Sequence, residues 1–132
     1  MSFPVPPDAT SDDDDAVKIL MVDDDQPILE VVSEALADAG YAVVTASTGD
    51  EALEKIRNDA GIDILFSDVV MPGLSGVELA KQAADLRPGL RIMLASGHAQ
   101  SWIEGLPQDV DFVAKPYRFG EILQTISRRL GA

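Results

Sequence analysis

The stretch "KILMVDDD" (residues 18–25) joins a short run of apolar residues directly to three carboxylates. The run has about the length of a strand and is apolar at nearly every position, which is typical of a parallel strand that helices cover on both faces. Three like charges at the end of such a strand repel one another unless a cation neutralises them. The stretch therefore predicts a buried strand with a polar site at its carboxyl end.

Comparable apolar runs recur along the chain, and helical patterns lie between them. The runs cover residues 19–22, 43–46, 64–66, 92–95 and 110–114. Five strands alternating with five helices predict a doubly wound α/β fold around a five-stranded parallel sheet with right-handed crossovers.

The ends of the helical patterns carry recognisable caps. Pro27 suits the first turn of the first helix, and Gly40 suits the position after its end. "TGDE" (residues 48–51) and "SGVE" (residues 75–78) have the spacing of a capping box and predict the starts of the second and third helices. The fourth helix, within residues 98–106, has the weakest pattern. The apolar face of the first helix is predicted to hold Ile28, Val32, Ala35, Leu36 and Ala39.

Composition limits the size, charge and partners of the protein. Its 132 residues suit one domain, and 23 acids against 10 bases give a net charge of −13. Residues 1–16 combine prolines with five acids, which predicts a disordered tail before a domain over residues 17–132. The only adjacent pair of bases that could form a patch is Arg128 and Arg129. Direct binding to nucleic acid is therefore not expected.

Other classes of protein are excluded by what the sequence lacks. It contains no cysteine, so neither a disulfide framework nor a thiolate site is possible. It has no signal peptide pattern, and no apolar run approaches the ~20 residues of a membrane span. These features predict a soluble cytoplasmic protein that does not insert into a membrane.

Polar residues with complementary chemistry stand at the carboxyl ends of four predicted strands. Ligands of open parallel sheets bind at these ends, where the strand order reverses, so we expect the side chains to converge. They are Asp23, Asp24 and Asp25 after the first strand, Asp68 after the third, Ser96 at the end of the fourth and Lys115 after the fifth.

Mg²⁺ is the cation that this set of groups predicts. It prefers oxygen ligands and retains positions for water and phosphate, whereas zinc favours Cys and clustered His. A carboxylate beside Mg²⁺ can attack phosphorus, and Asp68 stands alone at the end of the central strand, which makes it the candidate nucleophile. Lys115 and Ser96 then offer a positive charge and a hydroxyl donor to the phosphoryl oxygens. Asp25 has two open interpretations, a metal ligand or the cap of the first helix.

The motifs together resemble one known family. "KILMVDDD", "DILFSDVVMPGLSGVEL", "IMLASG" and "FVAKPY" stand in the order and at the spacings of the receiver domains of two-component response regulators. The resemblance covers residues 18–131. It implies the flavodoxin-like receiver fold with strand order 2-1-3-4-5.

The resemblance also implies roles for the acidic residues. Asp23 and Asp24 correspond to the acidic pair of the family, with Asp24 as the direct Mg²⁺ ligand, and Asp68 corresponds to the phosphoacceptor. The backbone carbonyl of Val70 completes the metal ligands that the protein supplies. Val70 and His98 stand two residues after the phosphoacceptor and the hydroxyl residue, where side chains influence the lifetime of the phosphoryl group.

Residues near the ends of the fourth and fifth strands match the switch of the family. By the resemblance, Ser96 and Lys115 bind the phosphoryl oxygens, and the bond before Pro116 is cis, an isomer accessible before proline. Phe112 occupies the position of the switch aromatic, which turns inward as Ser96 moves toward the phosphate. The face formed by the fourth helix, the fifth strand and the last helix would then change shape.

The function implied is that of a phosphoacceptor and not of an enzyme with an external substrate. We expect a single-domain response regulator that catalyses only its own phosphorylation and dephosphorylation. Its donor would be a sensor or hybrid histidine kinase or a histidine phosphotransferase, and "LASGHA" (residues 94–99) resembles receivers attached to hybrid kinases. Because only two residues follow Leu130, the signal is expected to pass to another protein.

Two alternatives remain at this stage. The chain could be an unphosphorylated, Mg²⁺-binding pseudo-receiver that acts as a constitutive docking module, although Asp68, Ser96 and Lys115 argue against this. A phosphomonoesterase would require an acid two residues after its nucleophile, where this chain has Val70.

Overall fold

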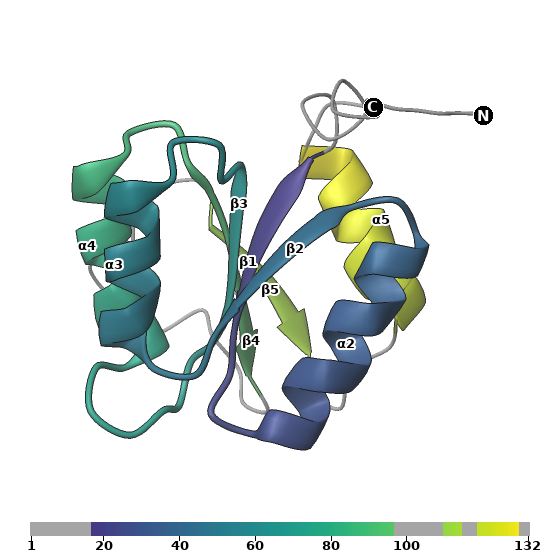
Figure 1. Cartoon of the computed structure of the whole chain (residues 1–132), viewed down its shortest axis with the longest axis horizontal. Coiled ribbons are helices and arrows are strands. Elements are labelled where there is room, and N and C mark those ends of the chain that lie inside the picture. The colour runs from purple at the N-terminus through teal and green to yellow at the C-terminus, as the bar shows by residue number, and fades with distance from the viewer. Residues whose placement is uncertain (1–16, 97–109, 115–118, 130–132) are drawn as a thin grey trace.

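Five strands and four helices make up the part of the chain that the computed structural model describes, residues 17–96, 110–114 and 119–129 (Figure 1). The strands are short and the helices have two to four turns. In chain order the elements are β1 (Lys18–Val22), α2 (Gln26–Asp38), β2 (Ala42–Ala46), α3 (Gly49–Asn58), β3 (Ile64–Asp68), α4 (Gly76–Leu86), β4 (Arg91–Ser96), β5 (Val110–Ala114) and α5 (Phe119–Arg129).

The strands form one parallel sheet in the order β2-β1-β3-β4-β5, so the predicted order is confirmed. The chain leaves β1 toward β2 on one side and then crosses to β3 on the other side. The strand order therefore reverses between β1 and β3, and this is where ligands of such sheets bind.

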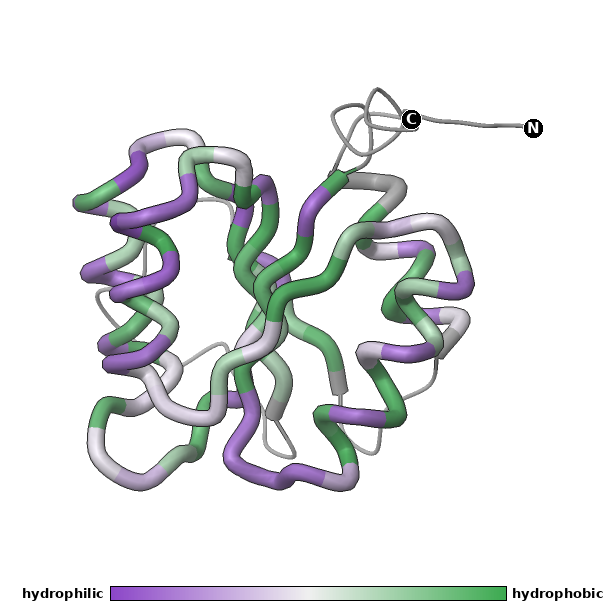
Figure 2. Tube along the Cα trace, viewed as in Figure 1, coloured by the Kyte–Doolittle hydropathy of each residue, from purple (hydrophilic) through white to green (hydrophobic). Residues whose placement is uncertain are grey.

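Two layers of helices cover the sheet. Helices α3 and α4 lie on one face, and α2 and α5 lie on the other (Figure 1). Successive residues of β1 alternate between these layers, because Leu20 and Val22 pack with the α3 and α4 side while Ile19 and Met21 pack with the α2 and α5 side. Burial on both faces explains why the strands are apolar throughout, as the hydrophobic centre of the fold in Figure 2 shows.

Helix α2 differs in detail from the prediction. Leu29, Val32 and Leu36 are its buried residues, and Leu29 was missing from the predicted face. Ala39 is exposed and forms the C-terminal cap, so its assignment to the apolar face was wrong. Gly40 follows with a φ of 104°, a left-handed conformation that favours glycine, as its predicted place after the helix requires.

The predicted N-terminal caps of α3 and α4 are confirmed. The hydroxyl of Thr48 accepts a hydrogen bond from the amide of Glu51 at 3.1 Å, and the hydroxyl of Ser75 accepts one from the amide of Glu78 at 3.2 Å. Each side chain thus satisfies an amide that the first turn of a helix leaves without an internal partner.

Some expectations concern segments outside the described residues. These are the acidic tail, residues 1–16, and the fourth predicted helix, within residues 98–106. Within the described segments, no helix combines the length and the apolar character needed to cross a bilayer.

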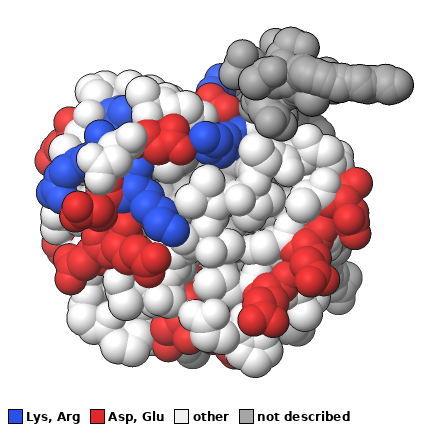
Figure 3. Space-filling view, in the orientation of Figure 1, with Lys and Arg blue, Asp and Glu red and all other residues white. Residues whose placement is uncertain are grey.

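Charge is unevenly distributed between the two helical layers. The acidic side chains Glu30, Glu34 and Asp38 are exposed along α2, and Figure 3 shows acidic atoms following this helix. Lysine and arginine side chains gather over α3 and α4 in the same view, mixed with acids. In this view α2 therefore presents acids to solvent, whereas α3 and α4 present both signs of charge.

Candidate functional site

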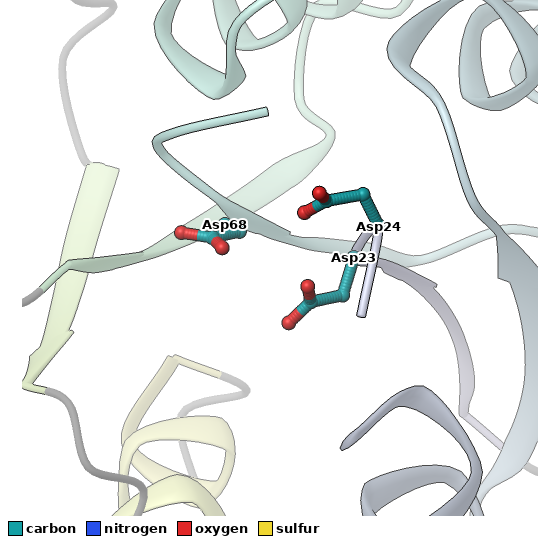
Figure 4. A group of neighbouring side chains, drawn as sticks. All are labelled: Asp23, Asp24 and Asp68. Atoms are coloured by element: carbon teal, nitrogen blue, oxygen red, sulfur yellow. The ribbon is translucent and has the colours of Figure 1, made fainter. Parts of the chain in front are cut away.

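Three carboxylates meet at the carboxyl ends of β1 and β3. These strands are direct neighbours, and Val22 pairs with Ser67, so the residues that follow lie side by side. One carboxylate oxygen from each of Asp23, Asp24 and Asp68 lies within 4.8 Å of the other two (Figure 4). The structure thus brings together acids that are 45 residues apart in the sequence.

The three side chains of this carboxylate group differ in their exposure to solvent. Asp23 is fully buried, Asp68 is 6% exposed, and Asp24 is exposed. Carboxylates at this separation repel one another strongly where water is excluded. A divalent cation that entered from the side of Asp24 would relieve the repulsion. Oxygen ligands alone, in a group with an open side, suit Mg²⁺, which keeps water or phosphate in its remaining positions.

Backbone amides fix the orientation of the two inner carboxylates. The amide of Asp25 donates to Oδ1 of Asp23 at 3.0 Å, and the amide of Val70 donates to Oδ1 of Asp68 at 3.3 Å. The loop after each strand therefore folds back onto the acid that ends the strand. Such bonds hold a carboxylate in place before any ligand arrives.

Asp25 has the structural role that one of its two interpretations predicted. Its side chain accepts a hydrogen bond from the amide of Ile28 at 3.2 Å, and it is the N-cap of α2. It does not belong to the carboxylate group of Asp23, Asp24 and Asp68. The cap interpretation is therefore confirmed.

The ends of β4 and β5 reach the same edge of the sheet. Asp68 pairs with Ala95, and Ser96 pairs with Ala114, the last residue of β5. The backbone of Ser96 therefore lies one residue beyond the level of Asp68 on the adjacent strand. Phe112 is half-buried in β5 and packs against the core on the α3 and α4 side.

Several predicted site residues fall where the structure makes no statement. Lys115, Pro116 and His98 lie outside the described residues, and the side chain of Ser96 is not described. Val70, which follows Asp68 by two residues, is 70% exposed, so its side chain faces solvent beside the carboxylates.

Two residues next to Asp68 were absent from the predicted site. Ser67 is fully buried, and its hydroxyl donates to the backbone oxygen of Asp68 at 2.9 Å. Gly76, the first residue of α4, lies against the same backbone oxygen. A weak signal for Gly76 stood in the sequence, because glycine is unfavourable in helices and here directly follows the cap residue Ser75.

Comparison with known proteins decides the family. The family model for the response regulator receiver domain matches residues 19–127, a span that contains the carboxylate group and, apart from Lys18 of β1, all five strands. The chain belongs to the response regulator receiver domain family.

Individual receiver domains support the same assignment. The chain is 30% identical over 116 residues to the response regulator receiver protein CpdR of Brucella abortus, covering 86% of this chain and 96% of that protein. It is 32% identical over 116 residues to the sensor kinase CckA of the same organism, covering 85% of this chain but only 12% of that protein.

Solved structures share the fold as well as the sequence pattern. A response regulator receiver protein from Sinorhizobium medicae superposes with a TM-score of 0.81 at 30% identity, covering 89% of this chain and 97% of that chain. The receiver domain of the hybrid histidine kinase CckA gives a TM-score of 0.74 at 32% identity, covering 86% and 98%. Receiver domains are in general the signalling phosphoacceptors of two-component systems and not classical enzymes.

Proposed function

We propose that this receiver domain accepts a phosphoryl group on Asp68, with Mg²⁺ bound by Asp23, Asp24, Asp68 and the backbone carbonyl of Val70. The donor would be the phosphohistidine of a sensor or hybrid histidine kinase or of a histidine phosphotransferase. The observation that carries the proposal is the meeting of three carboxylate oxygens within 4.8 Å at the switch point of the sheet.

Burial and position favour Asp68 over the other two acids as the nucleophile. Asp23 is the fully buried member of the carboxylate group, and Asp24 is an exposed residue in the turn before α2. Asp68 ends the central strand β3, whose two neighbours β1 and β4 hold its backbone. Its carboxylate combines a fixed direction with contact to solvent, as an attacking group requires.

The transfer itself would exchange one bond for another. A carboxylate oxygen of Asp68 attacks phosphorus in line with the phosphohistidine nitrogen, and the imidazole leaves with the electron pair of the broken P–N bond. Bound Mg²⁺ supplies positive charge to the phosphoryl oxygens. Ser96, the last residue of β4, and Lys115, which follows β5 in the sequence, would bind those oxygens as donors.

Phosphorylation would be read by a protein partner. The phosphoryl group adds charge and acceptor oxygens at Asp68, and movement of Ser96 toward them would let Phe112 repack. Phe112 is half-buried on β5, so a change in its packing would reach the face that β5 and α5 form with the fourth predicted helix. The likeness to CckA supports a place for this chain in a relay that involves a histidine kinase. We assign residues 17–132 to the receiver domain and residues 1–16 to an N-terminal tail.

Acetyl phosphate labelling tests the assignment. With Mg²⁺, the protein is expected to gain the mass of one phosphoryl group, and the gain should disappear in Asp68→Asn and when EDTA removes the metal. Asp24→Asn should raise the Mg²⁺ concentration needed for half-maximal labelling by about tenfold, because a ligand that contributes about 1.4 kcal/mol is lost. Asp85→Asn, an exposed acid on α4, is the matched control and should label normally.

Two results would contradict the proposal. Labelling that survives Asp68→Asn would place the phosphoryl group on another residue. No labelling of the wild-type protein, either from acetyl phosphate or from histidine kinases of the source organism, would favour the docking-module alternative.

A further inference from the structure

The first residue of α4 touches the backbone of the proposed phosphoacceptor. A Cβ atom in ideal geometry on Gly76 would lie 2.0 Å from the backbone oxygen of Asp68 and 2.8 Å from Cα of Val69. Real Cβ contacts essentially never fall below 3.0 Å. Both neighbours are backbone atoms, so no side chain could rotate away to admit a methyl group.

The backbone oxygen that Gly76 approaches is also held from another direction. The buried hydroxyl of Ser67 donates to it at 2.9 Å, and the amide of Gly76 donates to the next carbonyl, that of Val69, at 2.9 Å. The amide of Val69 in turn donates to Ala95 on β4 at 3.0 Å. The peptide groups on both sides of Val69 are therefore fixed by α4, β3 and β4 together.

The peptide group that follows Val69 also contacts the Asp68 carboxylate. The next amide along the chain, that of Val70, donates to Oδ1 of Asp68. A methyl group on residue 76 would push the Asp68 carbonyl or move the start of α4. Either shift turns the peptides between Asp68 and Val70, and so moves the amide that orients the carboxylate.

We infer that Gly76 and Ser67 are positioning residues of the phosphoacceptor: Gly76 by leaving room for the Asp68 carbonyl, and Ser67 by binding it. Gly76 has no side chain, and the buried Ser67 hydroxyl binds the Asp68 backbone oxygen, so both act through the backbone of Asp68 and neither is a catalytic residue. The inference rests on the proposed role of Asp68 and adds what holds that residue in its reactive orientation. Displacement of a reacting group by about 1 Å can lower a rate by about 100-fold.

A second glycine shows why the contact at Gly76 is special. A Cβ on Gly49, the first residue of α3, would lie 2.9 Å from two side-chain atoms of Leu74, in the loop between β3 and α4. Rotation of the Leu74 side chain moves Cδ2 but not Cβ, so the backbone at Leu74 must also shift slightly, whereas the clash at Gly76 is with the carbonyl of Asp68 itself. Gly49→Ala should therefore perturb the site less than Gly76→Ala.

The experiment compares alanine substitutions at glycines that differ in their surroundings and backbone conformation. Gly76→Ala is the test, and Gly120→Ala on α5, with no atom within 4 Å, is the neutral control. Gly89→Ala controls for stability, since its φ of 99° strains alanine in open space at the opposite end of the sheet from Asp68. The readouts are the rate of labelling by acetyl phosphate at saturating Mg²⁺, the Mg²⁺ dissociation constant from calorimetry, and the urea midpoint.

The expected result separates positioning from stability. Gly76→Ala should lose about tenfold to 100-fold in labelling rate while folded, and should bind Mg²⁺ more weakly. Gly89→Ala should lower the urea midpoint and leave the rate and the Mg²⁺ affinity within about twofold of wild type. Ser67→Ala, which adds no atoms and so serves if Gly76→Ala does not fold, should lose about threefold to tenfold in rate.

Wild-type rates and Mg²⁺ affinity in Gly76→Ala would overturn the inference. If that variant does not fold, an unchanged rate in Ser67→Ala would overturn it instead. Failure of the wild-type protein to be labelled would refute the proposed function, which is a different outcome from equal labelling of wild type and variants.

Discussion

Asp24 and Asp25 are adjacent acids with different surroundings. Asp24 contributes an oxygen to the carboxylate group, whereas the side chain of Asp25 caps α2 through the amide of Ile28. Only a short polar acceptor is needed for a cap, whereas an aspartate that binds Mg²⁺ contributes its negative charge as well as its oxygen. Substitutions that keep one property and remove the other can therefore separate the two roles.

Substitution of Asp25 tests this distinction. Asp25→Ala should lower the free energy of unfolding by about 1 kcal/mol, the usual effect of losing an N-cap, while Asp25→Ser should keep most of the stability because serine also caps well. Both variants should bind Mg²⁺ within about threefold of wild type, since one exposed charge beside the site acts weakly. Urea unfolding and calorimetry measure the two quantities. Loss of Mg²⁺ binding in the serine variant would assign Asp25 to the metal site after all.

The sequence was sufficient to predict which carboxylates meet, but not what holds them. Asp23 and Asp68 follow adjacent parallel strands, and this topology alone brings the strand ends together. The contacts of Ser67 and Gly76 with the Asp68 carbonyl depend on the path of the loop between β3 and α4. No periodicity or spacing specifies that path, because the loop residues are not restricted to one pattern of dihedral angles.

At the level of elements, the start of α3 contains the predicted capping box, but its glutamate binds the residue before the expected partner. Thr48 caps the amide of Glu51, as a capping box requires. The Glu51 carboxylate, however, accepts from the amide and the hydroxyl of Ser47, at 2.9 and 3.2 Å, and not from the amide of Thr48. The spacing thus predicted the helix start correctly, while the partner of the glutamate depends on how the chain enters the helix from β2.

This cap predicts a dependence of stability on pH. The hydrogen bond from the Ser47 amide lowers the pKa of Glu51 below its usual value of 4.5, helped by the Ser47 hydroxyl and by Lys55, while burial opposes the shift. A lowered pKa in the folded state adds stability above about pH 4.5 that is lost as the pH falls through the lowered pKa. Because Glu51 is exposed, the gain should be about 0.5 kcal/mol.

Glu51→Gln removes the titrating group and keeps an acceptor. Its difference in unfolding free energy from wild type should be present at pH 7 and vanish near pH 3, as measured by urea unfolding across that range. Glu54→Gln on the same helix, which removes one acid outside this cap, is the matched control. A Glu51→Gln difference that is equally large at pH 3 would mean that the carboxylate charge plays no part in the cap.

At the scale of the whole molecule, the two ends of the sheet carry different chemistry. The carboxylate group of Asp23, Asp24 and Asp68 lies at the carboxyl ends of the strands, whereas basic side chains make polar contacts at the amino ends. Nζ of Lys18 at the start of β1 contacts Oδ2 of Asp59 at 2.8 Å, and this bond is the main cause of a lowered pKa of Asp59. The Lys18–Asp59 ion pair and the carboxylate group of Asp23, Asp24 and Asp68 therefore lie at opposite ends of the sheet.

The overall fold could be predicted from the sequence because the central strand β3 and residues 19–22 of β1 are buried on both faces. Continuous apolar runs such as residues 64–66 are typical of strands in a parallel sheet that helices cover on both faces. The ion pair between Lys18 and Asp59 at the amino ends of the strands could not be predicted from the sequence. Lys18 and Asp59 are 41 residues apart, and no sequence pattern distinguishes their pair from exposed charges elsewhere.

Arg87, the C-terminal cap residue of α4, also makes contacts at the amino ends of the strands. Its substitution tests whether the two ends of the sheet act independently. Its guanidinium donates to the carbonyls of Asp59 and Ile62, at 3.3 and 2.5 Å. Arg87→Met should lower the free energy of unfolding by about 1–2 kcal/mol, because two carbonyls lose a charged donor. Arg87→Lys should recover only part of this, since one ammonium cannot reproduce a planar fork of donors.

The same variants should leave the chemistry at the other end unchanged. Below the urea transition, Arg87→Met should be labelled by acetyl phosphate at the wild-type rate, because its contacts lie at the opposite end of the sheet from Asp68. Arg57→Met, an exposed residue on α3, controls for loss of positive charge and should change neither stability nor labelling by much. A labelling rate that falls in Arg87→Met but not in Arg57→Met would show that the amino ends of the strands are coupled to the phosphoacceptor, and that the two ends do not act independently.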